Sequence, residues 1–264
     1  MGRKFAVGEV LPQSRYECKY LVPDELVPLI RDAISSFVRP DRFAALKDDR
    51  RYPVCSLYLD TPDLELCRKT LHGHKNRYKL RLRTYSDATD EPVYLEVKRR
   101  IDGAILKCRS RVPRAEAAEV VAGGSGATWD LLMDDSGGHD NFAVLANATG
   151  VGPVIRVRYQ REAYESIGWN PVRITFDTGI EYLVTLDGEV SHGGGDWRPT
   201  PVNGTVIEIK FTDRFPSWVG SLVRTFELKK LSVAKYCLSM THAIHEGRYV
   251  SAVLADLQAP FEAR

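Results

Sequence analysis

The sequence predicts an α+β fold in which helices pack outside a mostly antiparallel sheet of about eight strands. Charged and apolar residues alternate in many short segments, as they do in half-buried strands. Apolar residues recur at helical spacing near the start and the end of the chain. The 264 residues include 44% hydrophobic residues and have a net charge of +2, which excludes the disordered and collagen-like classes.

The predicted elements follow from these patterns in chain order. Strands are expected at 16–21, 54–60, 77–85, 92–100, 104–112, 154–166, 172–177 and 205–211, with a weaker candidate at 181–186. Helices are expected at 24–38, 63–71, 218–226 and 232–249, with a helical region at 114–149 that GGSG at 123–126 interrupts. Residues 189–201, which contain HGGGDW, are expected to form a loop. The chain 1–264 is expected to be a single domain, with a loose arm at 1–15.

Three strands contain a glutamate and a lysine two residues apart. They are Glu17-Cys18-Lys19, Glu96-Val97-Lys98 and Glu208-Ile209-Lys210. Because residues i and i+2 of a strand point to the same face, each charged pair lies on one face and the apolar residue on the other. Cations alternate with apolar residues in the same way at Lys79, Arg81 and Arg83, at Lys107 and Arg109, and at Arg156 and Arg158.

Two structures explain a sheet with one strongly charged face. The first is an antiparallel sheet whose polar face lies in water. The second is a closed eight-stranded barrel whose charged residues line the interior and whose apolar exterior is covered by helices. The charged face consists almost entirely of Arg, Lys and Glu, and it places like charges two residues apart, where they repel each other. This composition favours the barrel.

The cations are concentrated in one part of the chain. Residues 75–114 contain twelve Lys and Arg and five Asp and Glu, so this segment has a charge of +7 and the remainder −5.

An interior lined by like charges would be unfavourable when empty, and a triphosphate or phosphate chain would neutralise it. The few carboxylates suit a divalent cation, which prefers oxygen ligands. The P-loop motif is absent, so the protein is not expected to be a P-loop enzyme. The aromatic stacking pattern of RNA-binding modules is missing, so no nucleic acid is expected as a partner.

The ordered set of motifs resembles the triphosphate tunnel metalloenzymes, and within that superfamily the VTC (vacuolar transporter chaperone) polyphosphate polymerase domain. The matching segments run in family order from residue 16 to residue 236. They are CKYLV at 18–22, SLYLD at 56–60, KLRLR at 79–83, YLEVK at 94–98, RYQREAY at 158–164, RITFD at 173–177, VIEIK at 206–210 and SVAKY at 232–236.

The resemblance implies an eight-stranded tunnel in which ATP and Mn²⁺ or Mg²⁺ bind and the terminal phosphate is transferred to a growing polyphosphate chain. Glu208 would be the main metal ligand and Glu96 a second one. The catalytic phosphate-binding residues would be Lys19, Arg81, Arg83, Lys98, Lys210 and Lys235. Further candidates for substrate binding are Lys79, Lys107, Arg109, Arg156, Arg158, Tyr159 and Arg161. Arg161 has the opposite strand parity to Arg156 and Arg158, so either the strand contains a bulge or one set faces outward.

Two other activities remain open from the sequence. The same tunnel could hydrolyse triphosphate or polyphosphate, or it could bind polyphosphate or inositol phosphates without catalysis. Eukaryotic family members carry a phosphate-sensing domain and a membrane segment, and neither is expected here, so a membrane partner would be a separate protein. The five cysteines lack metal-ligand spacing and are expected to be reduced, as in a cytoplasmic protein that reaches a membrane only through a partner.

Overall fold

The computed structural model describes residues 16–101, 104–121, 138–168, 171–212 and 214–250. The arm predicted at 1–15 and the GGSG break at 123–126 lie outside the described residues. The strands are β1 Tyr16–Val22, β2 Val38–Pro40, β3 Arg51–Asp60, β4 Arg77–Thr84, β5 Val93–Ile101, β6 Ala104–Val112, β7 Gly152–Ser166, β8 Val172–Val184, β9 Arg198–Pro199 and β10 Thr205–Phe211. The helices are α1 Val27–Ile34, α2 Glu65–Leu71, α3 Arg114–Val121, α4 Gly138–Thr149, α5 Ser217–Thr225 and α6 Lys235–His245, with 3₁₀ turns at Asp24–Leu26 and Ala44–Leu46.

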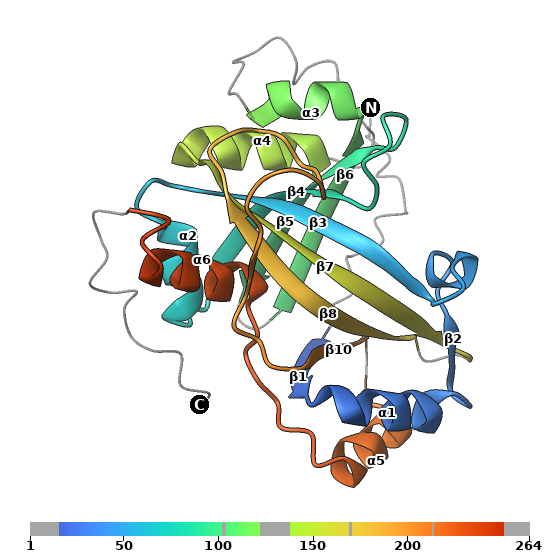
Figure 1. Ribbon diagram of the computed structural model, residues 1–264. Helices are drawn as coiled ribbons and strands as arrows, with labels where there is room; N and C mark the ends of the chain where they lie inside the picture. The colour runs from blue at the N-terminus through green and yellow to red at the C-terminus, as the bar shows by residue number, and fades with distance from the viewer. Residues whose placement is uncertain (1–15, 102–103, 122–137, 169–170, 213, 251–264) are drawn as a thin grey trace, which may run out of the picture.

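One antiparallel sheet organises the molecule. Its main path has the order β1-β10-β8-β7-β3-β4-β5-β6, while β2 pairs with β7 and β9 pairs with β8. This order places β1 and β10, from opposite ends of the chain, side by side. The α+β class, with an antiparallel sheet of eight main strands and helices packed outside it, is confirmed (Figure 1).

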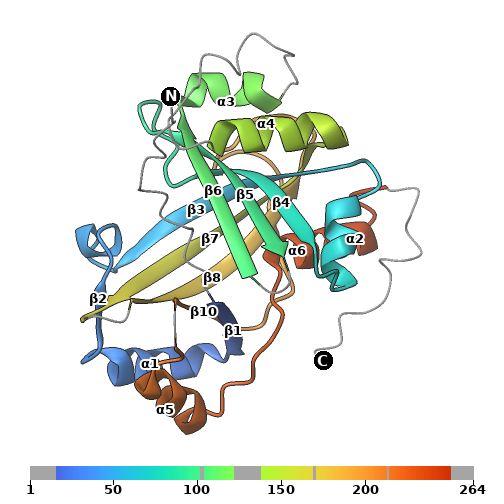
Figure 2. The same cartoon turned by 180° about the vertical axis from the view of Figure 1, so that it is seen from behind.

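The sequence predicted a closed barrel, but the hydrogen-bonded sheet is open and curled. Over the described residues, the edge strands β1 and β6 are not paired with each other. The sheet curls until β4, β5 and β6 cross over β3, β7 and β8 (Figure 2). The Nζ of Lys98 in β5 then lies 2.7 Å from Oε2 of Glu17 in β1. Long charged side chains therefore bridge a gap that is wider than the roughly 4.8 Å between paired strands.

Apolar side chains cover the outside of the sheet in two layers. Cys18, Ile174 and Ile209 on β1, β8 and β10 pack against Ile30 of α1 and Leu222 of α5. A second layer joins the outer face of β3, β4 and β5 to α3 and α4, and its members include Leu57, Leu80, Leu95, Ala117 and Phe142. Each fully buried Leu, Ile or Phe side chain among them contributes about 1.5–3 kcal/mol to stability. The apolar half of the alternating pattern is thus directed toward the helices.

Helix α6 lies on the opposite, concave face, where it packs against β7, β8 and α2. Its Tyr236 ring stacks on Tyr58 of β3 at 4.7 Å, and its hydroxyl donates to Asp60 at 2.6 Å. The Asp60 carboxylate also accepts the backbone N–H groups of Leu66 and Cys67, so it fixes α2 beside α6. These contacts place the first residue of α6, Lys235, over the concave face.

Strand β8 is longer than the sequence pattern predicted. Thr178, Gly179 and Ile180 separate the two predicted strands at 172–177 and 181–186, but the structure forms one strand from Val172 to Val184. The pairing with β7 shifts between Arg158 and Gln160, and Gly179 has a φ of 59°. A β-bulge, which glycine tolerates at positive φ, therefore takes the place of a turn.

Among the described residues, no helix is long and apolar enough to cross a membrane.

Candidate functional site

Most of the predicted site residues meet on the concave face of the sheet. This face carries ten of the predicted cations and four carboxylates. The cations are Lys19, Lys79, Arg81, Arg83, Lys98, Lys107, Arg109, Arg161, Lys210 and Lys235, and the carboxylates are Glu17, Glu96, Asp177 and Glu208. The ion pairs form three clusters centred on carboxylates, and Arg161 of the second cluster lies 3.9 Å from Glu208 of the third.

The first cluster surrounds Glu96 of β5, which has no exposed surface. Its Oε2 lies 2.6 Å from Nη2 of Arg81 and 3.8 Å from Nη1 of Arg83 in β4. Its Oε1 lies 2.6 Å from Nζ of Lys107 and 3.3 Å from Nε of Arg109 in β6. Burial raises the pKa of Glu96, but Arg81, Arg83 and Lys107 outweigh it and hold the pKa well below its usual range. Glu96 is therefore an ionised anchor that gathers four cations.

The second cluster surrounds Asp177 of β8, which is fully buried. Its carboxylate accepts a pair of hydrogen bonds from Arg161, at 2.7 and 2.8 Å, and one from Lys235 at 2.6 Å. Burial raises the pKa of Asp177, but Arg161 and Lys235 lower it to about 2 overall. The Tyr159 ring lies under both cations, with its centre 5.2 Å from the Arg161 guanidinium carbon and 4.9 Å from the Lys235 Nζ. The tyrosine hydroxyl accepts a hydrogen bond from Arg83 at 3.3 Å, which links the first two clusters.

The third cluster contains Glu17 of β1 and Glu208 of β10, and each carboxylate lies close enough to the other to affect its pKa. Lys19 lies 3.2 Å from Glu17, Lys210 lies 3.3 Å from Glu208, and Lys98 reaches Glu17 from β5. Burial raises the pKa of Glu208, but these lysines hold it well below its usual range. Two neighbouring carboxylates normally repel each other, so the three lysines are what keeps both ionised.

The concave face has more positive than negative charge. The ten predicted cations outnumber the four carboxylates that they surround. Many of them are partly buried, where like charges repel each other strongly. Burial and the neighbouring Lys19 and Lys210 lower the pKa of Lys98 to about 8, despite the attraction of Glu17. A linear polyanion laid along this face would neutralise the surplus and accept bidentate hydrogen bonds from arginines.

Two predicted substrate-binding residues, Arg156 and Arg158, face the other way. In the pairing with β3, Arg156 lies opposite Leu57 and Arg158 opposite Cys55, both of which belong to the outer apolar layer. Arg161 and Tyr159, by contrast, have the parity of the concave face. The sequence left open whether this strand contains a bulge or one set of cations faces outward, and the structure shows that Arg156 and Arg158 face outward. Their predicted place among the phosphate-binding residues of the concave face is therefore wrong.

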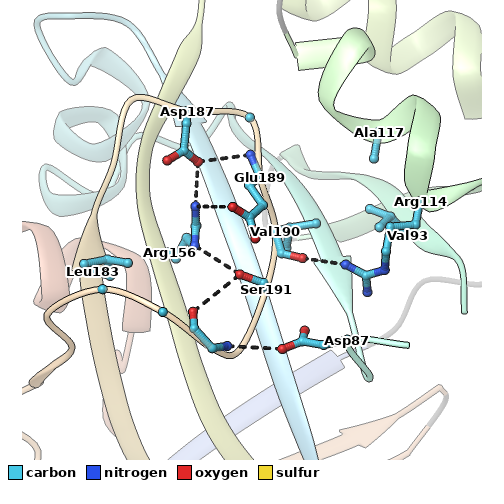
Figure 3. Close-up of a pocket in the computed structure, with 14 residues that line it drawn as sticks. Asp87, Val93, Arg114, Ala117, Arg156, Leu183, Asp187, Glu189, Val190 and Ser191 are labelled. Carbon is cyan, nitrogen blue, oxygen red and sulfur yellow. Dashed lines mark hydrogen bonds and ion pairs between the residues drawn. The ribbon is translucent and has the colours of Figure 1, made fainter. Parts of the chain in front are cut away.

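Arg156 instead lines an outer pocket of about 590 Å³ between the 187–195 loop and the segments around Asp87 and Arg114 (Figure 3). Its Nη2 lies 2.5 Å from Asp187, and its Nη1 donates to Ser191 at 3.2 Å. Arg158 pairs with Glu181 at 2.8 Å on the same side of the sheet. Both arginines thus have carboxylate partners of their own, outside the concave face.

The structure also changes the choice of metal ligands. Glu96 does not lie beside Glu208, because each belongs to a separate cluster of cations. Glu17 is the carboxylate that shares a cluster of lysines with Glu208, although the prediction did not name it as a ligand. Its signal was present in the sequence, since Glu17-Cys18-Lys19 repeats the pattern of Glu208-Ile209-Lys210. Within the described residues, no group of three or more His, Cys, Asp or Glu side chains lies close enough together to hold a metal ion.

A family model described as the VTC domain matches residues 14–244. The chain belongs to the VTC domain family. The resemblance noted in the sequence is therefore confirmed. The vacuolar transporter chaperone complex subunit 4 of Schizosaccharomyces pombe is 22% identical over 256 residues, which cover 82% of this chain and 34% of that protein. This VTC domain thus spans about a third of the length of that relative.

Solved structures with a similar arrangement include a putative adenylate cyclase from Bacillus halodurans (13% identity, 84% of this chain and 94% of that chain, TM-score 0.46). The PH1819 protein from Pyrococcus horikoshii is also 13% identical, over 86% of this chain and 98% of that chain, with a TM-score of 0.44. A putative adenylyl cyclase from Hippeastrum, described as having a dominant triphosphatase activity, is 16% identical over 87% of this chain and 96% of that chain, with a TM-score of 0.44.

Proposed function

We propose that this VTC domain is a metal-dependent polyphosphate polymerase, which transfers the terminal phosphate of ATP to the end of a growing polyphosphate chain. The observation that carries the proposal is the concave face, where ten cations converge around four carboxylates. A chain of phosphates matches this face in charge, in its linear form and in the planar oxygen pairs that arginine binds. Membership of the VTC domain family supports the same substrate class.

Arg81 and Arg83 are suited to hold the triphosphate. Their guanidinium groups are fixed by Glu96, by the Tyr58 hydroxyl at 3.0 Å from Arg81, and by Ser56 Oγ at 3.0 Å from Arg83. Because these contacts orient the donors before the ligand binds, little reorganisation is needed when charge develops on the transferring phosphoryl group. Lys98 and Lys210, from the third cluster, would neutralise the remaining phosphates.

In the proposed reaction, an oxygen of the terminal phosphate of the acceptor chain attacks the γ-phosphorus of ATP. The bond between that phosphorus and the β–γ bridging oxygen breaks, and ADP leaves with the bonding electrons. The protein contributes position and electrostatic stabilisation, since phosphoryl transfer spreads negative charge over the equatorial oxygens. Lys235 and Arg161, held by Asp177, place further positive charge along the same face.

Glu17 and Glu208 fit a divalent metal better than Glu208 and Glu96 do. They supply hard oxygen ligands on adjacent strands, and their lowered pKa values keep both ionised at neutral pH. Two carboxylates leave coordination positions for phosphate oxygens, as Mg²⁺ sites in phosphoryl-transfer enzymes usually do. When bound there, Mn²⁺ or Mg²⁺ would neutralise charge on the triphosphate.

The proposal is tested by incubating the purified protein with ATP, Mn²⁺ and a short polyphosphate primer and separating the products by chain length on a gel. The proposal expects long chains from the wild type and none from Glu208→Ala. Release of free phosphate without chain growth would indicate hydrolysis. Unchanged ATP with tight polyphosphate binding would indicate a binding module, and either of these two results would contradict polymerisation.

A further inference from the structure

Four aromatic side chains meet beside the Glu96 cluster, and we call them the aromatic patch. They are Phe43 before β3, Tyr52 in β3, Tyr85 directly after β4 and Tyr94 in β5. Phe43 stacks on Tyr85 with ring centres 5.9 Å apart and an angle of 10° between the planes. Tyr52 and Tyr94 lie at a tilt to Tyr85, at 6.1 and 5.8 Å. The patch is thus a set of rings gathered from four separate segments.

The aromatic patch is continuous with the phosphate-binding cations. Arg109 lies over the Tyr94 ring at 3.6 Å, donates to the Tyr85 hydroxyl at 2.9 Å and contacts Glu96. Tyr85 follows Arg83 by two positions. Burial raises the pKa of Tyr85, but Arg83 and Arg109 lower it overall, which is consistent with this proximity. A ligand whose phosphates lie on Arg83 and Arg109 would therefore place its next group against these rings.

Buried Asp41 holds the patch in place. Its Oδ1 accepts the backbone N–H groups of Phe43 at 3.1 Å and Ala44 at 2.8 Å. Its Oδ2 accepts the Tyr52 hydroxyl at 3.3 Å and Arg173 at 2.6 Å. Phe43 is consequently fixed although its residue is 38% exposed. An exposed aromatic ring that is held rigid loses little conformational freedom when a ligand stacks on it.

An arginine side chain also lies over the Phe43 ring. The guanidinium of Arg42, an exposed residue, lies 4.6 Å from the centre of the Phe43 ring, on which Tyr85 also stacks. A guanidinium is flat, as a nucleobase is, and its long side chain lets it move aside or close over a base. Aromatic rings and arginine planes are the groups on which proteins stack bases.

We infer that the aromatic patch binds the base of the nucleoside triphosphate, which stacks on Phe43 under Arg42. The inference rests on the proposed function, because it requires the triphosphate to lie on the neighbouring cations. Stacking of the base would make the site prefer a nucleoside triphosphate over inorganic tripolyphosphate, a preference that phosphate contacts alone do not provide.

Calorimetric titration of the full chain with ATP and with inorganic tripolyphosphate, each with the same Mn²⁺ concentration, tests the inference. Phe43→Ala should weaken ATP binding roughly tenfold, a typical loss for one stacked base. Tripolyphosphate binding should change less than about twofold, since that ligand has no base. Phe43→Trp should restore ATP binding. Phe215→Ala is the matched control, since Phe215 is 40% exposed and packs on Phe211 instead.

Equal losses for both ligands would mean that Phe43 supports the phosphate site, and would overturn the inference. Unchanged ATP binding in Phe43→Ala would overturn it as well. Failure of the wild type to bind tripolyphosphate would be a different result, because it would remove the proposed function on which the inference rests.

Discussion

Glu96 is the residue at which the electrostatics of the concave face can be tested most sharply. Glu96→Gln keeps the size of the side chain but removes the negative charge that pairs with Arg81, Arg83, Lys107 and Arg109. Leaving buried charges uncompensated costs about 3–5 kcal/mol. Lys107 and Arg109 have side chains that are 42% and 35% exposed and can turn toward water. The expected loss is therefore near the lower limit, about 3 kcal/mol.

For a chain of this length, a loss of about 3 kcal/mol lowers the melting temperature by roughly 6–12 °C. The same substitution raises the positive potential of the site, while the Tyr58 and Ser56 hydroxyls still hold Arg81 and Arg83. Tripolyphosphate should therefore bind more tightly and produce a larger increase in melting temperature at equal concentration. Thermal unfolding followed by circular dichroism, with and without tripolyphosphate, measures both effects.

Glu181→Gln provides the control for this experiment. Glu181 pairs with Arg158 outside the concave face and its side chain is 36% exposed, so its loss should cost less than about 1 kcal/mol. The ligand-induced shift should stay at the wild-type value. A Glu96→Gln variant that melts at the wild-type temperature, or that responds less to tripolyphosphate than the wild type does, would refute the reasoning.

Three further predictions concern binding and pH. Arg81→Ala should raise the tripolyphosphate Kd about tenfold, most clearly at low salt, whereas Arg158→Ala should leave it unchanged; equal effects in calorimetry would contradict the assignment of the two faces. Because the pKa of Lys98 is about 8 in the free protein, tripolyphosphate binding at pH 8 should take up protons and weaken as the pH rises. Lys98→Arg, which stays charged, should show the smaller uptake in buffers of different ionisation enthalpy. The pKa of Asp177 is lowered to about 2, so its contribution to stability is present above about pH 4 and is lost as the pH falls toward 2. In Asp177→Asn, the melting temperature should therefore fall less steeply between pH 4 and pH 2 than it does in the wild type.

The alternation of charged and apolar residues was sufficient to predict the sheet and the gathering of most of its charged side chains on one face. Three Glu-x-Lys motifs on separate strands have a physical meaning only if one face is apolar and covered, which is what the helices α1, α4 and α5 provide. The sequence could not show how far the sheet curls, because that depends on twist and on the Glu17–Lys98 contact between strands distant along the chain.

Strand parity explains the two errors of placement. Arg156 and Arg158 alternate with apolar residues just as Arg81 and Arg83 do. The sequence of one strand does not show whether its cations lie on the same face of the sheet as the cations of another strand. Only the register against β3 settles the question. Likewise, Glu17 became a metal-ligand candidate only when β1 was seen to pair with β10, which is almost two hundred positions away along the chain.

The aromatic patch illustrates a second limit. Phe43, Tyr52, Tyr85 and Tyr94 belong to different segments with no common spacing, so no sequence motif brings them together. Their association follows from the pairing of β3, β4 and β5 and from the Asp41 hydrogen bonds that fix Phe43.

The central claim is that triphosphate lies along the concave face of the sheet. A crystal structure with tripolyphosphate and Mn²⁺ tests it most directly. The account predicts phosphate density between Arg81 and Lys210, with the metal ion against Glu17 and Glu208. Phosphates bound in the outer pocket beside Arg156, with the concave face unchanged, would contradict it.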